Sequence, residues 1–441
     1  MKRKIENHLK QWTASKTNRA FMIEGARQIG KTYSIRKFAE ENFVHLLDIN
    51  FENQKDLLKS FEACENPDQA VMVLQTYALS RRITDITRGK TLIFFDEIQM
   101  CKRLYSLMKP LCEMDKYAFV LSGSLLGVNL GSDYLDPGPL VIHERMFPMD
   151  FEEYLWAKGI DGEIIESIKG SLRTGKIVAK PMHDLLNSII KEYIAVGGMP
   201  KVVQVYLDSK DFAKAYLEQE AIIRLYRNDI QQYQNSAESK IKTISAFDSI
   251  PKQFSKENHK FQYQTIKQGY GSRYFETAID WLDLAGIVHR CYQITHLQNS
   301  LVDGKSTGFK LFMNDVGLLV CFLGHQYVYR LMNDELGLFK GAIYEQLVAQ
   351  ILVSKEEKLY YASLGRYEID YLLEDAGKIY PIECKSGNNT KSKSLSVYIE
   401  TYSPVKAFKV SMNNVNYQNK IMRALPIYGL ALLSMEELYA L

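Results

Sequence analysis

Gly25-Ala26-Arg27-Gln28-Ile29-Gly30-Lys31-Thr32 fits the pattern G-x-x-x-x-G-K-T, in which a glycine-rich loop wraps a phosphate group. The loop follows a short apolar run at residues 20–23 and precedes apolar residues at helical spacing through Asn42. A strand, a loop and the start of a helix in this order present backbone N–H groups to phosphate oxygens. The segment therefore predicts a nucleotide site after a buried strand of an α/β domain.

The side chains of this loop have expected roles. The two glycines let the backbone approach the phosphates, because a side chain would stand in the way. Lys31 is expected to reach the β- and γ-phosphates of ATP, and Thr32 to ligate Mg²⁺ through its hydroxyl. The predicted nucleotide-binding residues are Gly25, Arg27, Gln28, Ile29, Gly30, Lys31, Thr32, Tyr33 and, from a later strand, Ser122.

A second apolar run, residues 92–95, ends in Asp96 and Glu97. This pattern is typical of a buried parallel strand with acids at its C-terminal end. After a phosphate loop it indicates a Walker B element, in which Asp96 would hold Mg²⁺ and Glu97 would orient or deprotonate the attacking water. The alternative is a strand that simply ends in solvated acids.

The apolar residues 118–121 predict a neighbouring strand that runs into Ser122-Gly123-Ser124. A polar residue here is where AAA-type ATPases place a γ-phosphate sensor, and both serines are candidates. The alternative for each serine, taken by itself, is that it belongs to a Ser-Gly turn and has no role in binding.

These segments resemble the core of prokaryotic AAA-type ATPases that carry an uncharacterised C-terminal domain. The resemblance rests on residues 25–32, 95–99 and 121–124, and extends to Met146–Leu155 and Tyr193–Pro200. It implies an ATP hydrolase with Lys31 and Glu97 as catalytic residues. Relatives often have a Gly-Arg pair where this chain has Gly138-Pro139, and the nearest arginine is Arg145, so we assign no arginine finger.

The middle of the chain predicts helices between Met182 and Gln234, after a glycine-containing linker at 160–182. A helix that ends at Gly286, followed by a strand at 287–294, suggests a winged-helix module, which the resemblance also implies. Its basic residues could form a face that contacts phosphates, or they could form an ordinary solvated charged surface. These residues are Lys252, Lys256, Lys260, Lys267 and Arg273.

The C-terminal region predicts a helix carrying Glu345, then strands at 359–361, 367–373 and 378–385. This order resembles the PD-(D/E)xK core of restriction-endonuclease-like domains, with Asp370, Glu383 and Lys385 as catalytic residues. Asp370 and Glu383 would bind Mg²⁺ through oxygens, and the metal would make hydroxide from water. Lys385 lies on the strand face of Glu383 and could position that water. The alternative is a retained fold whose acids serve structure or binding alone.

The composition bounds these predictions. With 46% apolar and 24% charged residues in 441, the chain is an ordinary globular one of two or three domains. A net charge of +3 neither requires nor excludes binding to nucleic acid. Six scattered cysteines favour reduced thiols. We find no signal peptide and no bilayer-spanning apolar run, so we expect a cytoplasmic protein without a membrane partner.

We therefore expect an α/β architecture in four parts. These are an AAA-type P-loop core with a parallel sheet and helices on both faces at 1–150, a helical lid or linker region at 151–235, a winged-helix-like domain at 236–335, and a smaller restriction-endonuclease-like α/β domain at 336–441. The expected function is a Mg²⁺-dependent ATPase that acts as an ATP-driven switch on DNA or a partner protein. An ATP-gated nuclease and a non-catalytic, nucleotide-sensing scaffold are the alternatives, and a homo-oligomer stays open.

Overall fold

The computed structural model describes residues 1–124, 138–234, 236–254, 260–297, 300–337, 339–365, 367–386, 392–417 and 419–441. Lys256, one of the predicted basic residues, and the side chain of Ser124 lie outside this description. The chain divides into two compact units, which we describe separately. The N-terminal unit holds residues 2–147 and 284–286, and the C-terminal unit holds Met1, 148–283 and 287–441.

A five-stranded sheet forms the centre of the N-terminal unit. Its strand order is β2-β3-β4-β1-β5, and every pair is parallel. The strands are β1 (Ala20–Gly25), β2 (His45–Asn50), β3 (Thr91–Asp96), β4 (Ala118–Ser124) and β5 (Val141–Arg145). β1 and β3 are buried along their whole lengths, as expected for strands covered on both faces. The predicted parallel α/β core is confirmed.

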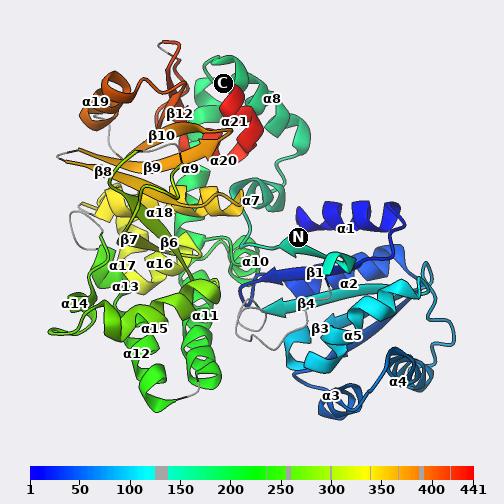
Figure 1. Cartoon of the computed structure of the whole chain (residues 1–441). Helices are drawn as coiled ribbons and strands as arrows, with labels where there is room; N and C mark the ends of the chain where they lie inside the picture. The colour runs from blue at the N-terminus through cyan, green and yellow to red at the C-terminus, as the bar shows by residue number, and fades with distance from the viewer. Residues whose placement is uncertain are drawn as a thin grey trace. The chain divides into compact units, whose positions relative to one another are not determined.

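Helices cover both faces of this sheet. α1 (Ile5–Ala14) and α2 (Lys31–Asn42) lie on one face, and α3 (Lys55–Glu62), α4 (Pro67–Ser80) and α5 (Lys102–Glu113) on the other (Figure 1). On the second face the ring of Phe95 stacks on those of Phe51 and Phe119 and meets Phe61 edge-on. Such aromatic burial makes the strand that carries Asp96 a rigid support.

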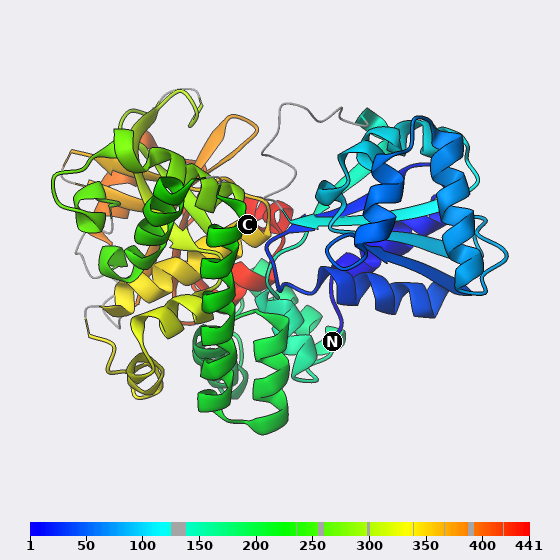
Figure 2. The same cartoon turned by 90° about the horizontal axis from the view of Figure 1, so that it is seen from below.

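The C-terminal unit begins with helices: α7 (Phe151–Ala157), α8 (Gly162–Thr174), α9 (Lys180–Val196), α10 (Pro200–Ser209) and α11 (Phe212–Tyr233). α10 and α11 lie side by side (Figure 2). The predicted linker at 160–182 is wrong, because α8 fills most of it. Asp161 caps this helix, which ends at Gly175 with φ of +68°, and Ile165, Ile168 and Leu172 bury one of its faces.

A second, seven-stranded mixed sheet follows, in the order β12-β11-β10-β9-β8-β6-β7. The strands are β6 (Val288–Ile294), β7 (Lys305–Met313), β8 (Tyr360–Leu364), β9 (Tyr367–Asp375), β10 (Lys378–Lys385), β11 (Ala407–Ser411) and β12 (Met422–Pro426). β6, which we predicted as the strand of a winged-helix module, pairs with β7 in a hairpin and on its other side with β8. Strands that we predicted in two domains, 236–335 and 336–441, therefore share one sheet.

The remaining helices surround this sheet (Figure 1). They are α12 (Ala237–Asp248), α13 (Ile250–Phe254), α14 (Tyr263–Ile266), α15 (Ser272–Leu284), α16 (Val316–Leu323), α17 (Gln326–Met332), α18 (Phe339–Ser354), α19 (Lys393–Tyr402), α20 (Ile427–Leu432) and α21 (Met435–Ala440). α18 packs against β7 and β10 and is buried almost throughout. In the described ranges no helix combines the length and the apolar character needed to cross a membrane.

Candidate functional site

The glycine-rich loop connects β1 to α2 in the N-terminal unit. Gly30 has φ of +92° and Gln28 φ of +67°, so the loop turns through the left-handed region before the helix begins. A Cβ atom on Gly25 would lie 2.3 Å from the carbonyl oxygen of Met146, so only glycine fits. Arg3 Nη1 donates to the carbonyl oxygen of Ile29 at 2.6 Å and supports the loop from behind.

Lys31 begins α2 and is buried. Its Nζ donates to the carbonyl oxygens of Gly25 and Ala26, both at 2.8 Å. Burial lowers the pKa of Lys31 to about 8, although the nearby charges of Glu97 and Asp96 oppose this shift. The ammonium is thus held by carbonyl dipoles, and within the described ranges no carboxylate forms an ion pair with it, so a phosphate could serve as its anion.

Asp96, at the end of β3, is the centre of a hydrogen-bond network. Its Oδ2 accepts from the hydroxyl of Thr32 at 3.0 Å and from the side-chain amide of Asn50 at 2.9 Å. Its Oδ1 accepts from the hydroxyl of Ser122. The carboxyl ends of β2, β3 and β4 therefore meet the start of α2 at one carboxylate. We did not predict Asn50, although a polar residue ending the strand beside β3 was a usable signal.

Glu97 follows directly in a strained conformation. Its φ of +56° lies in the left-handed region, which costs a non-glycine residue on the order of 1 kcal/mol. The side-chain amide of Gln99 donates to Glu97 Oε2. A Cβ atom on Gly123 would lie 2.9 Å from Gln99 Oε1, so the glycine leaves room for this amide. Strain of this kind gathers at functional sites, and Gln99, which we did not predict, orients the carboxylate.

The structure thus brings together Lys31, Thr32, Asp96 and Ser122 of the predicted residues, with Glu97 next to Asp96 in the chain. Arg27 turns toward Glu52, with Nη2 to Oε1 at 3.6 Å, and Tyr33 is 59% exposed on α2. The three hydrogen bonds to Asp96 described above come from other residues.

The donor set around Asp96 fits magnesium. In the described part of the chain no group of three or more His, Cys, Asp or Glu side chains is placed to hold a metal ion. Magnesium with a nucleotide needs fewer protein ligands, because it keeps waters and binds one or two carboxylates together with phosphate oxygens. One carboxylate, from Asp96, beside the hydroxyl of Thr32 meets that requirement.

The acidic side chains of the C-terminal unit gather around a buried lysine. Lys310 of β7 is 2% exposed, and its Nζ lies 2.7 Å from Glu345 Oε1 and 2.7 Å from Glu368 Oε1. Asp370 Oδ2 accepts from the backbone N–H of Cys384 at 2.7 Å. We did not predict Lys310, which stands as a single cation in the apolar run 309–313.

The predicted catalytic residues of this region lie beside that cluster. Lys385 Nζ donates to Glu383 Oε1 at 2.5 Å, while Glu383 Oε2 is buried without a hydrogen-bond partner in the described residues. Burial, with the charges of Glu383 and Glu345, raises the pKa of Asp370 well above its usual range. Burial also raises the pKa of Glu383, against the pull of Lys385.

Lys310 behaves differently from these acids. Burial acts to lower the pKa of Lys310, but the negative charges of Glu345 and Glu368 outweigh burial and raise this pKa well above its ordinary value. The cluster therefore carries its own fixed cation. Because this ammonium neutralises carboxylates that a metal would need, the residues fit a metal ion poorly, and we derive no chemistry through one here.

The segments 146–155 and 193–200 have a structural explanation. Asp315, which caps α16, accepts from the backbone N–H of Gly198 at 2.6 Å and of Leu318 at 2.9 Å. A Cβ atom on Gly197 would lie 2.1 Å from Asp315 Oδ1, so the double glycine makes room for this carboxylate. Burial raises the pKa of Asp315 to about 6 in spite of these hydrogen bonds.

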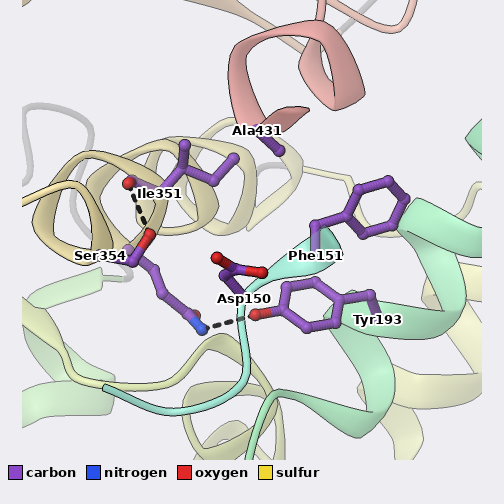
Figure 3. A pocket seen from close by; sticks show the side chains of 7 residues that line it. Asp150, Phe151, Tyr193, Ile351, Ser354 and Ala431 are labelled. Atoms are coloured by element: carbon purple, nitrogen blue, oxygen red, sulfur yellow. Dashed lines mark hydrogen bonds between the residues drawn. The ribbon is translucent and has the colours of Figure 1, made fainter. Parts of the chain in front are cut away.

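A small cavity lies next to this turn (Figure 3). The hydroxyl of Tyr193 donates to the carbonyl oxygen of Met149 at 2.6 Å and accepts from the side-chain amide of Gln350 at 2.9 Å. The cavity has about 10 Å³, room for about one water molecule. From Met149 and Tyr193 onward, these motif segments therefore join elements of the C-terminal unit.

Comparison with known proteins identifies the class of the first part of the chain. Residues 17–155 match the family described as an AAA domain, and this range contains all five strands of the parallel sheet. With the loop geometry above, this range is a P-loop α/β domain that matches the AAA family model. Residues 187–327 and 340–430 match two domains of unknown function, DUF8612 and DUF4143. The restriction-endonuclease-like identity of the last region stays a prediction.

The chain is similar to several solved structures. One is the Walker-type ATPase PABY2304 of Pyrococcus abyssi, at 14% identity over 73% of this chain and 95% of that chain, with a TM-score of 0.43. Another is Cdc6p from Pyrobaculum aerophilum, at 14% identity over 75% and 93%, with a TM-score of 0.23. No curated protein matches the chain.

Proposed function

We propose that this protein is a Mg²⁺-dependent ATPase that works as an ATP-driven switch on DNA or a partner protein. The observation that carries the proposal is the convergence of Thr32, Asn50 and Ser122 on the carboxylate of Asp96, beside a glycine-rich loop. These hydroxyl and amide donors are neutral, so they hold the carboxylate in place without neutralising its charge.

The residues have distinct proposed roles. The loop N–H groups and Lys31 bind the phosphates, Thr32 and Asp96 hold Mg²⁺, and Ser122 keeps Asp96 oriented. When bound, magnesium would offset negative charge on the phosphate oxygens. Glu97, held by Gln99, orients or deprotonates the attacking water.

The test compares wild type with Glu97→Gln. We expect the variant to bind a fluorescent ATP analogue like wild type and to lose turnover by roughly 10²-fold or more, because the group that accepts the proton of water is gone. Glu40→Gln is the matched control, since Glu40 is an exposed acid of α2. Turnover equal to wild type in Glu97→Gln would reject the assigned role. Measuring turnover with and without DNA then tests DNA as the partner.

A metal-dependent nuclease in the C-terminal unit is the second candidate. The observation in its favour is the buried, unpaired Glu383 Oε2, and the one against it is the salt-bridged Lys310. If the unit cleaves DNA or RNA with Mg²⁺ or Mn²⁺, Asp370→Asn should stop cleavage and leave ATP turnover intact. Absence of cleavage in wild type would remove this candidate and leave the ATPase proposal standing.

A further inference from the structure

A groove lined by aromatic side chains lies in the C-terminal unit, along residues 261–271. This segment contains α14 and leads into α15 (Figure 1). The groove has a volume of about 440 Å³, within the range of small-ligand sites. Its lining residues are Phe261, Gln262, Tyr263, Gln264, Gly269, Tyr270 and Gly271. Nothing in the proposed ATPase uses this groove.

The groove wall is anchored to the edge strand of the seven-stranded sheet. The backbone N–H of Phe261 donates to the carbonyl oxygen of Phe309 in β7 at 2.9 Å, and the two rings stack with centroids 5.0 Å apart. The side chain of Gln253 bonds both backbone groups of Gln262, at 3.1 and 3.0 Å. The hydroxyl of Tyr263 donates to Glu276. The aromatic wall is therefore pre-organised, which lowers the entropic cost of binding.

The charge along this wall is positive. Between Lys260 and Phe275 the sequence holds three cations, Lys260, Lys267 and Arg273, and no acid. Lys267 Nζ lies 4.4 Å from the ring centre of Tyr270, so a cation borders the groove directly.

Three acids close to the wall share a single cation, Arg290, which compensates only part of their negative charge. Arg290 lies 2.9 Å from Glu276, 2.6 Å from Asp280 and 3.7 Å from Asp283, measured between nitrogen and oxygen. Lys260 Nζ lies 4.0 Å from Glu368 Oε2, and Lys267 and Arg273 form no ion pair with an acid of the part of the chain that the structure describes. Lys267 and Arg273 are exposed and stay available for an anion in solution.

We propose that this groove binds single-stranded nucleic acid. An unstacked base would take the place of the Lys267 ammonium over the ring of Tyr270, and the displaced Lys267, together with Arg273, would contact the adjoining phosphates. Stacking on aromatic rings with cations along the backbone is how proteins hold single strands, whereas a duplex keeps its base faces covered. The proposal names a partner class for the ATP-driven switch, but binding at the groove requires neither Lys31 nor Glu97.

The test is fluorescence anisotropy with the full chain, without nucleotide and at low salt. The probes are labelled oligo(dT) and oligo(U) of about 15 nucleotides and a duplex of the same length. We expect a single strand to bind more tightly than the duplex, and the two oligonucleotides to show whether DNA or RNA is preferred. Tyr270→Ala should raise Kd roughly tenfold, and Tyr270→Phe should keep wild-type affinity because it keeps the ring.

A second variant tests the phosphate contact. Lys267→Ala should lower the slope of log affinity against log salt by about 0.7, the value for one phosphate contact of a single strand. The matched controls are Tyr329→Ala, which removes a 68%-exposed tyrosine of α17, and Lys214→Ala, which removes an exposed lysine of α11. Both should bind like wild type.

Three results would overturn the proposal: no binding of either single strand, wild-type affinity and salt slope in both Tyr270→Ala and Lys267→Ala, or equal affinity for duplex and single strand. Lys31→Ala should bind the oligonucleotides like wild type. Oligonucleotide binding can thus fail while ATP turnover persists, or the reverse, so the two proposals are tested separately.

Discussion

Lys31 and Lys310 are both buried cations near carboxylates, yet their surroundings are opposite. Lys31 donates to two backbone carbonyl oxygens, and burial brings its pKa down to about 8. Lys310 lies between Glu345 and Glu368, and their charges bring its pKa well above the ordinary value, against the effect of burial. An incoming anion would stabilise the charged form of Lys31, whereas the charged form of Lys310 is already stabilised by two carboxylates. Under the proposed function, the comparison separates a lysine that binds a ligand from a lysine that stabilises the fold.

The largest expected effect follows from removing Lys310. Lys310→Met leaves the buried Glu345 without its counter-charge, so we expect the free energy of unfolding to fall by about 3–5 kcal/mol. Urea unfolding measures this change. Lys378→Met, at an exposed lysine of β10, is the control and should change stability by less than about 0.5 kcal/mol. A stable Lys310→Met protein would remove the contrast between the two lysines.

Removing Lys31 should have the reverse profile. Lys31→Met deletes a phosphate contact, so ATP turnover should fall by roughly 10²–10³-fold. The free energy of unfolding should change by no more than about 1 kcal/mol. The two hydrogen bonds lost with the ammonium are offset by the desolvation cost of burying its charge, which is lost as well. Turnover and urea unfolding are measured on the same preparation, with the exposed Lys59→Met of α3 as control. If Lys31→Met destabilises the fold but each folded molecule still turns over ATP at the wild-type rate, Lys31 does not contact the phosphates.

The pKa of Lys31 predicts how ATP binding changes with pH. Bound phosphate favours the charged amine, so the complex holds this proton more tightly than the free protein. Affinity should therefore be constant below about pH 8 and fall as pH rises above it, by up to tenfold per pH unit. Titration with a fluorescent analogue measures it. In Lys31→Arg any remaining affinity should be independent of pH, since a guanidinium stays charged. A flat wild-type curve would show that the charge of Lys31 does not matter.

The smallest expected effect concerns Gln99. Gln99→Leu frees the carboxylate of Glu97, so kcat should fall roughly tenfold while KM for ATP stays unchanged, because the residue acts on orientation and not on binding. Steady-state kinetics measure both constants. Gln75→Leu, at an exposed glutamine of α4, is the control. If KM rises and kcat does not fall, Gln99 is not a positioning residue.

The sequence could predict the parts of the site that are local in the chain. Residues 20–42 contain a complete strand, loop and helix start, and Asp96 ends a strand whose apolar run is continuous. Asn50 and Lys310 could not be predicted in the same way, because their roles depend on which strand lies beside theirs. The order β2-β3 brings Asn50 to Asp96, and the order β6-β7, with α18 packed on β7, brings Lys310 to Glu345.

Two errors have physical reasons as well. The glycines of 160–182 suggested a linker, but three buried apolar residues on one face outweigh the helix-breaking cost of Gly170, about 1 kcal/mol. The helix and the strand at 287–294 matched a winged-helix module locally, and only the pairing of β6 with β8 shows that this strand belongs to the larger sheet.

The pairing of β6 with β8 also governs how the chain can be dissected. A cut between residues 335 and 336 follows the predicted boundary, yet it would separate two hydrogen-bonded neighbours of one sheet. The isolated 336–441 fragment would present the bare backbone edge of β8 to solvent and to other copies, an arrangement prone to aggregation. Truncation for biochemical work therefore has to keep residues 287–441 together.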